Sequence, residues 1–205
     1  RGRTWQSGLG DGLTFSLLWR FEGGATALSG LSLAVGAGLI RTLHAIGLHD
    51  AQLKWPNDLL HGYHKLAGIL IELQGDMEGP SAAVIGVGIN LRLPEYLRKH
   101  IDQAATDLQT VLGRTVNPSE LLGSTLCHLA DVLSDFERDG FEALREEWIS
   151  HHAYQGQSVR LLLPDGRETQ GVVSGVAADG ALLMDTINGT QRFSAGEISL
   201  RGASQ

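Results

Sequence analysis

Two segments of the chain combine basic and acidic side chains in a way that could do chemistry on an anion. Residues 54–58 read Lys-Trp-Pro-Asn-Asp, so a lysine, an amide and a carboxylate gather where the proline ends a strand. Strand ends are where the binding sites of α/β sheets usually lie. Residues 65–72 read Lys-Leu-Ala-Gly-Ile-Leu-Ile-Glu, with Lys65 at the mouth of an apolar strand and Gly68 open to close approach by a ligand or another backbone. The plainer alternatives are a strand-ending turn, an exposed lysine and a β-bulge.

Two glycine-bearing segments add candidate contacts to a phosphate and to a base. Residues 1–5 read Arg-Gly-Arg-Thr-Trp, in which glycine lets backbone amides approach an anion and the arginines add forked positive groups. Trp5 offers a flat face for stacking on a base, although a solvated terminus is the alternative for this segment. Residues 86–90 read Gly-Val-Gly-Ile-Asn, and the amide of Asn90 suits a phosphate or a metal-bound water. This segment lacks the third glycine of a dinucleotide-binding fingerprint, so we reject a Rossmann fold.

Composition and charge exclude several classes of protein. The 205 residues include 16 Lys plus Arg and 23 Asp plus Glu, a net charge of −7, which disfavours a general nucleic-acid binder. The single cysteine, Cys127, rules out an internal disulfide framework and fits a reducing compartment, so we expect a cytoplasmic protein. No apolar run approaches the length of about 20 residues that a membrane-spanning helix needs. We therefore expect no membrane partner.

The elements that must position these segments fall into two parts. Before residue 154 the pattern of apolar residues predicts strands at 14–21, 52–55, 66–73 and 82–91 and helices at 28–46, 117–138 and 141–149. After residue 153 the turn sequences Pro-Asp-Gly, Asp-Gly and Asn-Gly separate short β-like runs, which is typical of a small barrel or sandwich. We expect one domain at residues 1–153 and a second at residues 154–205.

Together the four segments resemble the signature of the biotin protein ligase family. Residues 1–5 match the tail of its Gly-Arg-Gly-Arg-x-Gly-Arg-x-Trp loop, and the other three segments are complete and in order. The resemblance implies an α+β fold, in which a mixed β-sheet with packed helices, of the class II synthetase type, precedes a small SH3-like barrel. Residues 196–201, Gly-Glu-Ile-Ser-Leu-Arg, also resemble the end of the bacterial members. Because the family's catalytic domain begins further upstream, we expect this chain to be the C-terminal part of a longer polypeptide.

The resemblance also implies a reaction and its partners. The carboxylate of biotin would join the α-phosphate of ATP, and a lysine of the biotin carboxyl carrier protein of acetyl-CoA carboxylase would then attack the mixed anhydride. ATP and biotin would be substrates, with Mg²⁺, and a homodimer is one implied assembly. By family position the catalytic residues would be Lys65, Asp58 and Arg3, and biotin would lie against Lys65 and Gly68. The nucleotide would contact Arg1, Gly2, Arg3, Trp5, Lys54, Asn57, Asn90, Arg160 and Arg201, with Asn90 near the metal.

Three other functions compete with this interpretation. Lipoate and octanoate ligases or transferases share the catalytic fold, but they lack the complete segment found at residues 54–58. A repressor that responds to biotin would need an upstream DNA-binding domain, and we expect no nucleic-acid binding by this chain alone. A catalytically inactive binding module is disfavoured because Lys65 and Asp58 are both present.

Overall fold

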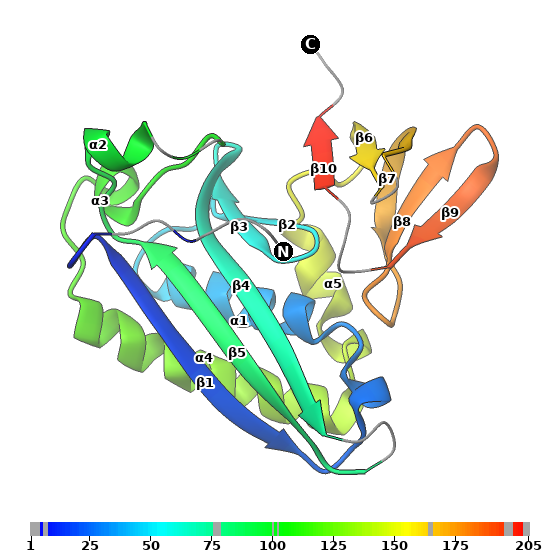
Figure 1. The fold of residues 1–205 in the computed structure, drawn as a ribbon, viewed down its shortest axis with the longest axis horizontal. Coiled ribbons are helices and arrows are strands. Elements are labelled where there is room, and N and C mark those ends of the chain that lie inside the picture. The colour runs from blue at the N-terminus through cyan, green and yellow to red at the C-terminus, as the bar shows by residue number, and fades with distance from the viewer. Residues whose placement is uncertain are drawn as a thin grey trace.

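The computed structural model describes two sheets and the helices packed against them. The described residues are 5, 8–75, 79–99, 101, 103–163, 166–194 and 199–202, the last four by their backbone only. Each sheet has five strands, and the larger one carries helices along one face (Figure 1). The expected α+β class is therefore confirmed. Within the described residues, no helix has both the length and the apolar character needed to cross a membrane.

The larger sheet contains the strands on which the candidate segments lie. Its strands are β1 (Gly12–Phe21), β2 (Gln52–Lys54), β3 (Asp58–His61), β4 (His64–Gly75) and β5 (Ser81–Asn90), in the spatial order β1-β5-β4-β3-β2. All neighbouring strands run antiparallel. Short connections account for this in the pairs β2–β3, β3–β4 and β4–β5, whereas β1 reaches β5 from far away in the sequence. The sheet thus differs from the expected mixed sheet. Parallel pairing between described residues is limited to two isolated bridges, Leu53 with His152 and Lys65 with Ala105.

The helices cover one face of this sheet. Alternate residues of β5 are buried, namely Ala83, Ile85, Val87 and Ile89, as expected for a strand with one face in a core. Figure 1 shows α1 (Leu31–Ala45) and α4 (Pro118–Asp139) behind the sheet, with α5 (Glu142–Ser150) toward the smaller sheet. The predicted start of α4 is confirmed, because the side chain of Asn117 accepts a hydrogen bond from the backbone N–H of Ser119. The opposite face of the sheet is free of these helices.

Three short helices and one strand were not predicted from the sequence. The helices are η1 (Ala25–Leu28), α2 (Glu95–Arg98) and α3 (Leu108–Leu112), each too short to show a helical period. The strand is β3, which has only four residues and follows directly after Pro56 and Asn57. These two residues are typical of a turn, so the sequence pattern places the polar Asp58 in that turn and not in a strand.

The smaller sheet forms the second part of the chain. Its strands are β6 (Ser158–Leu162), β7 (Glu168–Val176), β8 (Leu182–Thr186), β9 (Gly189–Phe193) and β10 (Ser199–Gly202), in the order β10-β6-β7-β8-β9. All its pairs are antiparallel, and the predicted Asp-Gly and Asn-Gly turns precede β8 and begin β9. The sheet fits the SH3-like barrel that the sequence predicts. The division at residue 154 stays a prediction, and it falls between the end of α5 and the start of β6.

Close backbone contacts join the two parts. The indole N–H of Trp55, a fully buried side chain, donates to the carbonyl oxygen of Gly180 at 2.9 Å. A Cβ atom at Gly180 would lie only 2.7 Å from the Cα atom of Gly30, which precedes α1. Leu53 exchanges backbone hydrogen bonds with His151 and Ala153, both at 2.8 Å, in the segment that follows α5. The segment at residues 53–55 is therefore held by the chain after α5 and, at Trp55, by the turn before β8.

Candidate active site

The structure brings Lys65 and Asp58 together as an ion pair. Asp58 begins β3 and lies opposite Gly68 of β4, with a β-bulge between Leu59 and Leu60. The ammonium Nζ of Lys65 lies 2.5 Å from Oδ1 of Asp58, and the two side chains are 20% and 15% exposed. The pair is therefore largely shielded from bulk water, yet each group keeps a surface that a ligand could reach.

Gly68 makes room for this ion pair. A Cβ atom at position 68 would lie 3.1 Å from both Cε and Nζ of Lys65 and 3.5 Å from Oδ1 of Asp58. The close approach that the sequence predicts at Gly68 is thus made by the Lys65 side chain. Because position 68 has no side chain, the end of the Lys65 side chain can lie against the backbone of β4, next to Asp58 on β3.

Hydrogen bonds fasten the segment at residues 54–58 to β4. The side-chain amide of Asn57 donates to the carbonyl oxygen of Ile69 at 2.7 Å, and the N–H of Ile69 donates to the carbonyl oxygen of Asn57 at 2.9 Å. The hydroxyl of Ser32 on α1 donates to the carbonyl oxygen of Pro56 at 3.2 Å. Asn57 therefore orients Asp58 through the backbone, a positioning function that its expected role in nucleotide binding did not include.

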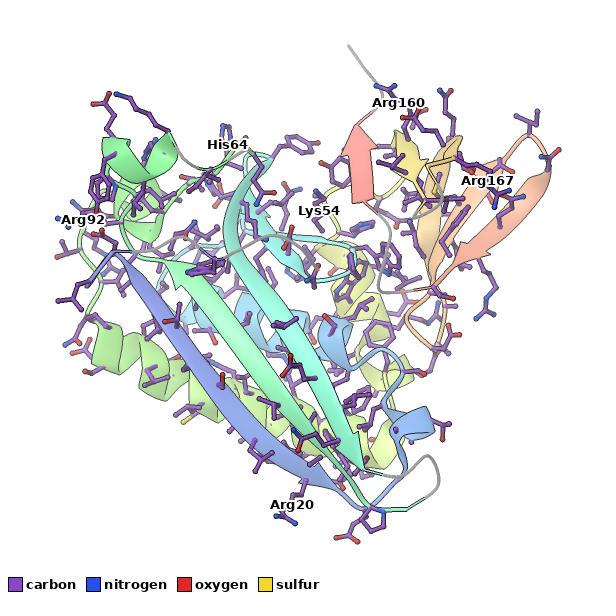
Figure 2. All side chains as sticks on the ribbon, viewed as in Figure 1. Arg20, Lys54, His64, Arg92, Arg160 and Arg167 are labelled. Carbon is purple, nitrogen blue, oxygen red and sulfur yellow. The ribbon has the colours of Figure 1, made fainter. Side chains whose placement is uncertain are left out.

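A cavity of about 150 Å³ opens beside the ion pair. Lys54, Asp58 and Lys65 line it from the larger sheet, and Figure 2 shows Lys54 near the middle of the molecule. Its walls include two aromatic residues that the sequence did not single out, Tyr63 and Tyr154, with ring centroids 5.6 Å apart. Burial, with a smaller contribution from Tyr63, raises the pKa of the Tyr154 phenol above its usual value. The wall thus combines the turn between β3 and β4 with the segment between α5 and β6.

Trp5 lies over Gly88 of β5. A Cβ atom at Gly88 would lie 2.8 Å from Cε2 and Cζ2 of the Trp5 indole, so the ring rests directly on the backbone of β5. Gly88 is the register partner of Gly68, which places the ring one strand away from the glycine under Lys65. The described residues of the four sequence segments, which include only Trp5 of residues 1–5, therefore meet on the face of the sheet opposite α1 and α4.

This contact gives a direct test of where Trp5 lies. Gly88→Ala should displace the ring, because its Cβ has no room, and should raise the quenching of Trp5 fluorescence by acrylamide. Gly86→Ala is the matched control on the same strand and face, since the nearest atom to its Cβ is 3.4 Å away. Difference spectra against Trp5→Phe isolate the signal. Equal quenching in the two alanine variants would contradict the contact.

Asn90 helps to hold residues 104–106, a segment for which the sequence predicts no function. Its side-chain amide donates to the carbonyl oxygen of Thr106 at 2.9 Å and to that of Lys65 at 3.4 Å. The backbone of Lys65 is also bonded on both sides, to Ala104 and to Thr106, each at 2.9 Å. Asn90 is only 6% exposed, so its amide nitrogen acts here as a link that holds this segment beside Lys65.

The described residues do not build a metal site of their own. Among them, no group of three or more His, Cys, Asp or Glu side chains is placed to hold a metal ion. Asn90 supplies at most one oxygen donor, whereas Mg²⁺ requires six ligands and commonly takes them from carboxylates, phosphates and water. The residues present therefore do not fit a resident Mg²⁺, and the role of Asn90 near the metal stays a prediction.

The remaining expected site residues are placed only in part. Arg1, Gly2 and Arg3 lie outside the described residues. Arg160 lies on β6 and its backbone pairs with that of Arg201 on β10. The guanidinium of Arg160 is 3.8 Å from Glu168, and Figure 2 shows it on the smaller sheet, apart from Lys54.

Comparisons with known proteins find the same family over both parts of the chain. The model of the Biotin/lipoate A/B protein ligase family matches residues 1–90, and that of the Biotin protein ligase C terminal domain matches residues 154–201. The bifunctional ligase/repressor BirA of Salmonella typhimurium is 35% identical over 203 residues, 99% of this chain, and the chain spans 63% of that relative's length. The biotin–[acetyl-CoA-carboxylase] ligase of Paracoccus denitrificans is 31% identical over 98% of this chain and 85% of its own.

A solved structure shows the same fold. Biotin protein ligase from Aquifex aeolicus, in complex with biotin and ATP, superposes with a TM-score of 0.79 at 28% sequence identity, covering 94% of this chain and 79% of that one. The similarity extends over both sheets, as the two family models do. On these grounds the chain belongs to the biotin protein ligase family.

Proposed function

We propose that this chain carries the site at which a biotin protein ligase activates biotin with ATP and transfers it to a carrier protein. The observation that carries the proposal is the Lys65–Asp58 ion pair, at 2.5 Å, beside a backbone strip made flat by Gly68 and Gly88. A strip without side chains suits a ligand that lies along the strands. The adjoining ammonium suits a ligand with a carboxylate or a phosphate.

The first step must bring two anions together. The carboxylate oxygen of biotin attacks the α-phosphorus of ATP, the bond to the β-phosphate oxygen breaks, and pyrophosphate leaves. In this proposal Lys65 moves its charge from Asp58 to the reacting oxygens, where charge accumulates in the transition state. Gly68 keeps the biotin chain close to Lys65.

Other residues are proposed to hold the nucleotide. Lys54 lines the same cavity as Lys65 and offers a second positive group for the phosphates. Trp5 supplies a ring for the adenine. Asn57 and Asn90 hold in place the backbone beside Asp58 and Lys65. Further positive groups or backbone amides for the phosphates are proposed at Arg1, Gly2, Arg3, Arg160 and Arg201. Mg²⁺ enters only as part of the ATP substrate and carries no step.

The second step transfers biotin to an amine. A lysine of the carrier protein attacks the acyl carbon, AMP leaves with the electrons of the broken C–O bond, and the amine loses a proton. Because an unperturbed lysine has a pKa of about 10.4, a nearby carboxylate must assist that loss. We propose Asp58 as the carboxylate that receives this proton once Lys65 has turned toward the phosphate.

Partners follow from this chemistry. The proposed protein substrate is the biotin carboxyl carrier protein of acetyl-CoA carboxylase, and a second copy of the chain is the other partner that the family implies. We propose the cytoplasm as the compartment, since the one cysteine, Cys127, is a free and exposed thiol. Nucleic acid and membrane have no part in the proposed reaction.

Substrate choice tests the proposal directly. The protein is incubated with MgATP and either biotin, lipoate or octanoate, and pyrophosphate release is measured. Biotin should support release and the two fatty acids should not. Release with lipoate or octanoate but not with biotin would replace this proposal by a lipoate-ligase function, which the first family model also covers.

Asp58→Asn should separate the two steps. Asparagine still offers an oxygen to Lys65, so pyrophosphate release should fall little, but it accepts no proton. Transfer of biotin from presynthesised biotinyl-AMP to the carrier should slow by about 100-fold, within the range of a general base. Single-turnover transfer and pyrophosphate release are measured on the same preparation. Equal losses in both would mean that Asp58 acts only by holding Lys65.

A further inference from the structure

A buried carboxylate lies just before β1, outside the four segments that carry the proposed chemistry. Asp11 is 3% exposed, and its backbone carbonyl accepts hydrogen bonds from the N–H groups of Leu91 and Arg92, both at 3.0 Å. Its Oδ1 accepts from Nε and Nη2 of Arg92 at 3.0 and 2.7 Å, and its Oδ2 accepts from the hydroxyl of Tyr96 at 2.9 Å. The backbone N–H of Asp11 donates to Gly8 at 3.1 Å. Every polar group of this residue is therefore engaged.

These contacts join two parts of the chain that are far apart in sequence. Asp11 precedes β1, whereas Arg92 and Tyr96 follow β5, and the last pair of the β1–β5 ladder is Gly12 with Asn90. The three side chains thus extend the pairing of these strands beyond the end of the ladder. Figure 2 shows Arg92 at this end of β1. We call the group of Asp11, Arg92 and Tyr96 the Asp11 clamp.

Gly8 packs against the clamp without spare room. A Cβ atom there would lie 2.5 Å from Oδ2 of Asp11 and 2.6 Å from the hydroxyl oxygen of Tyr96. Gly8 is three residues after Trp5, whose indole lies on Gly88, two residues before the end of β5. The chain before β1 is thus in contact with β5 at Trp5 and with the segment after β5 at Gly8 and Asp11.

We propose that Asp11 is a positioning residue that holds the Trp5 ring on Gly88, through the clamp it forms with Arg92 and Tyr96. The clamp fixes the chain just before β1 relative to the end of β5. The Trp5 ring therefore loses less conformational entropy when a nucleotide binds. The expected effect on nucleotide binding rests on the proposed function. The expected effect on the position of the Trp5 ring is independent of it.

The charge of the clamp is constant near neutral pH. Hydrogen bonds from Arg92, and then from Tyr96, hold the pKa of Asp11 below its usual value, while burial opposes them. A carboxyl whose folded-state pKa is lowered contributes stability above the unfolded-state pKa, and loses that contribution as the pH falls through the folded-state value. The effect of Asp11→Asn should therefore not change between about pH 6 and pH 8, because the carboxyl group stays ionised over that range.

Fluorescence quenching tests the proposal without any substrate. Acrylamide quenching of Trp5, isolated by difference from Trp5→Phe, is measured in the full chain carrying Asp11→Ala or Asp11→Asn. The quenching constant should rise about twofold in Asp11→Ala, because local opening exposes a half-covered ring. It should rise less in Asp11→Asn, which keeps one acceptor oxygen. Asp135→Ala is the control, since it removes a carboxylate paired with an arginine, Arg138, on the distant helix α4.

Kinetics supply the second readout. The KM for ATP should rise about tenfold in Asp11→Ala, the scale of a lost base-stacking contact, while kcat stays nearly unchanged. Should Asp11→Ala fail to fold by circular dichroism, Tyr96→Phe carries the test, since it removes only the hydroxyl that donates to Asp11 from an exposed side chain. Unchanged quenching in a folded variant would overturn the proposal. Increased quenching in a protein without biotin-dependent pyrophosphate release would uphold the clamp and reject the proposed function instead.

Discussion

Lys65→Gln should lower biotin-dependent pyrophosphate release by at least about 100-fold, which corresponds to about 3 kcal/mol of transition-state stabilisation. The substitution removes one positive charge at the point where a carboxylate and a phosphate are proposed to meet. Glutamine still donates a hydrogen bond, so it fits over Gly68 and beside Asp58. The fold should therefore be kept, because the Lys65 side chain is not part of the hydrophobic core and, among the described residues, its ammonium pairs only with the partly exposed Asp58.

A surface variant supplies the control for this prediction. Arg138→Gln removes a positive charge from α4, where the side chain is 65% exposed and the guanidinium is paired with Asp135 and Asp139. It should leave pyrophosphate release close to that of the unaltered protein. If Lys65→Gln also releases pyrophosphate at nearly the unaltered rate, then the ammonium takes no part in the chemistry and the ion pair is structural.

The parts of the fold that were predictable are those that depend on local patterns. The cap at Asn117 and the glycine at position 140 bound a long helix, and both act within one helical turn of its ends. The apolar run at residues 82–91 predicts β5, whose alternate residues Ala83, Ile85, Val87 and Ile89 are buried in the core. By contrast, β3 is defined by its partners, since four residues after a proline contain no period of their own.

The candidate site was predictable as a set of residues but not as a geometry. The types and spacing of Lys65 and Asp58 were informative, yet their distance depends on the register of β3 and β4 and on one β-bulge. Asp11 and Arg92 are 81 positions apart, and nothing local to either residue predicts their ion pair. Long-range polar contacts of this kind arise only once the sheet has set which strand ends lie together.

The contact between Gly180 and Gly30 leads to the second large effect that we expect. Gly180 has a φ of +80°, and its carbonyl oxygen is the partner of the buried Trp55 indole. Gly180→Ala therefore has two costs. One is the left-handed backbone, about 1–2 kcal/mol for a residue with a side chain. The other is the displacement of a turn whose Cβ would lie 2.7 Å from the backbone of Gly30.

A second glycine with a positive φ, at the start of β9, separates these two costs. Gly189 has a φ of +89°, but a Cβ atom there would meet nothing within 4 Å, so Gly189→Ala carries only the backbone cost. Gly180→Ala should be the less stable of the two by about 1–3 kcal/mol, the penalty for leaving the buried indole N–H without its acceptor. Urea unfolding of both variants measures this difference.

Activity should respond to the same substitution, because Trp55 is only three residues before Asp58. Moving the turn at Gly180 moves the acceptor that holds Trp55, and with it the segment that orients Asp58 and lines the cavity beside Lys65. We expect pyrophosphate release to fall in Gly180→Ala and to stay nearly unchanged in Gly189→Ala, at a urea concentration where both are folded. Equal stability and equal activity of the two variants would show that the smaller sheet can shift without disturbing the ion pair. The hydrogen bond from Trp55 would then be a consequence of packing and not a support of the site.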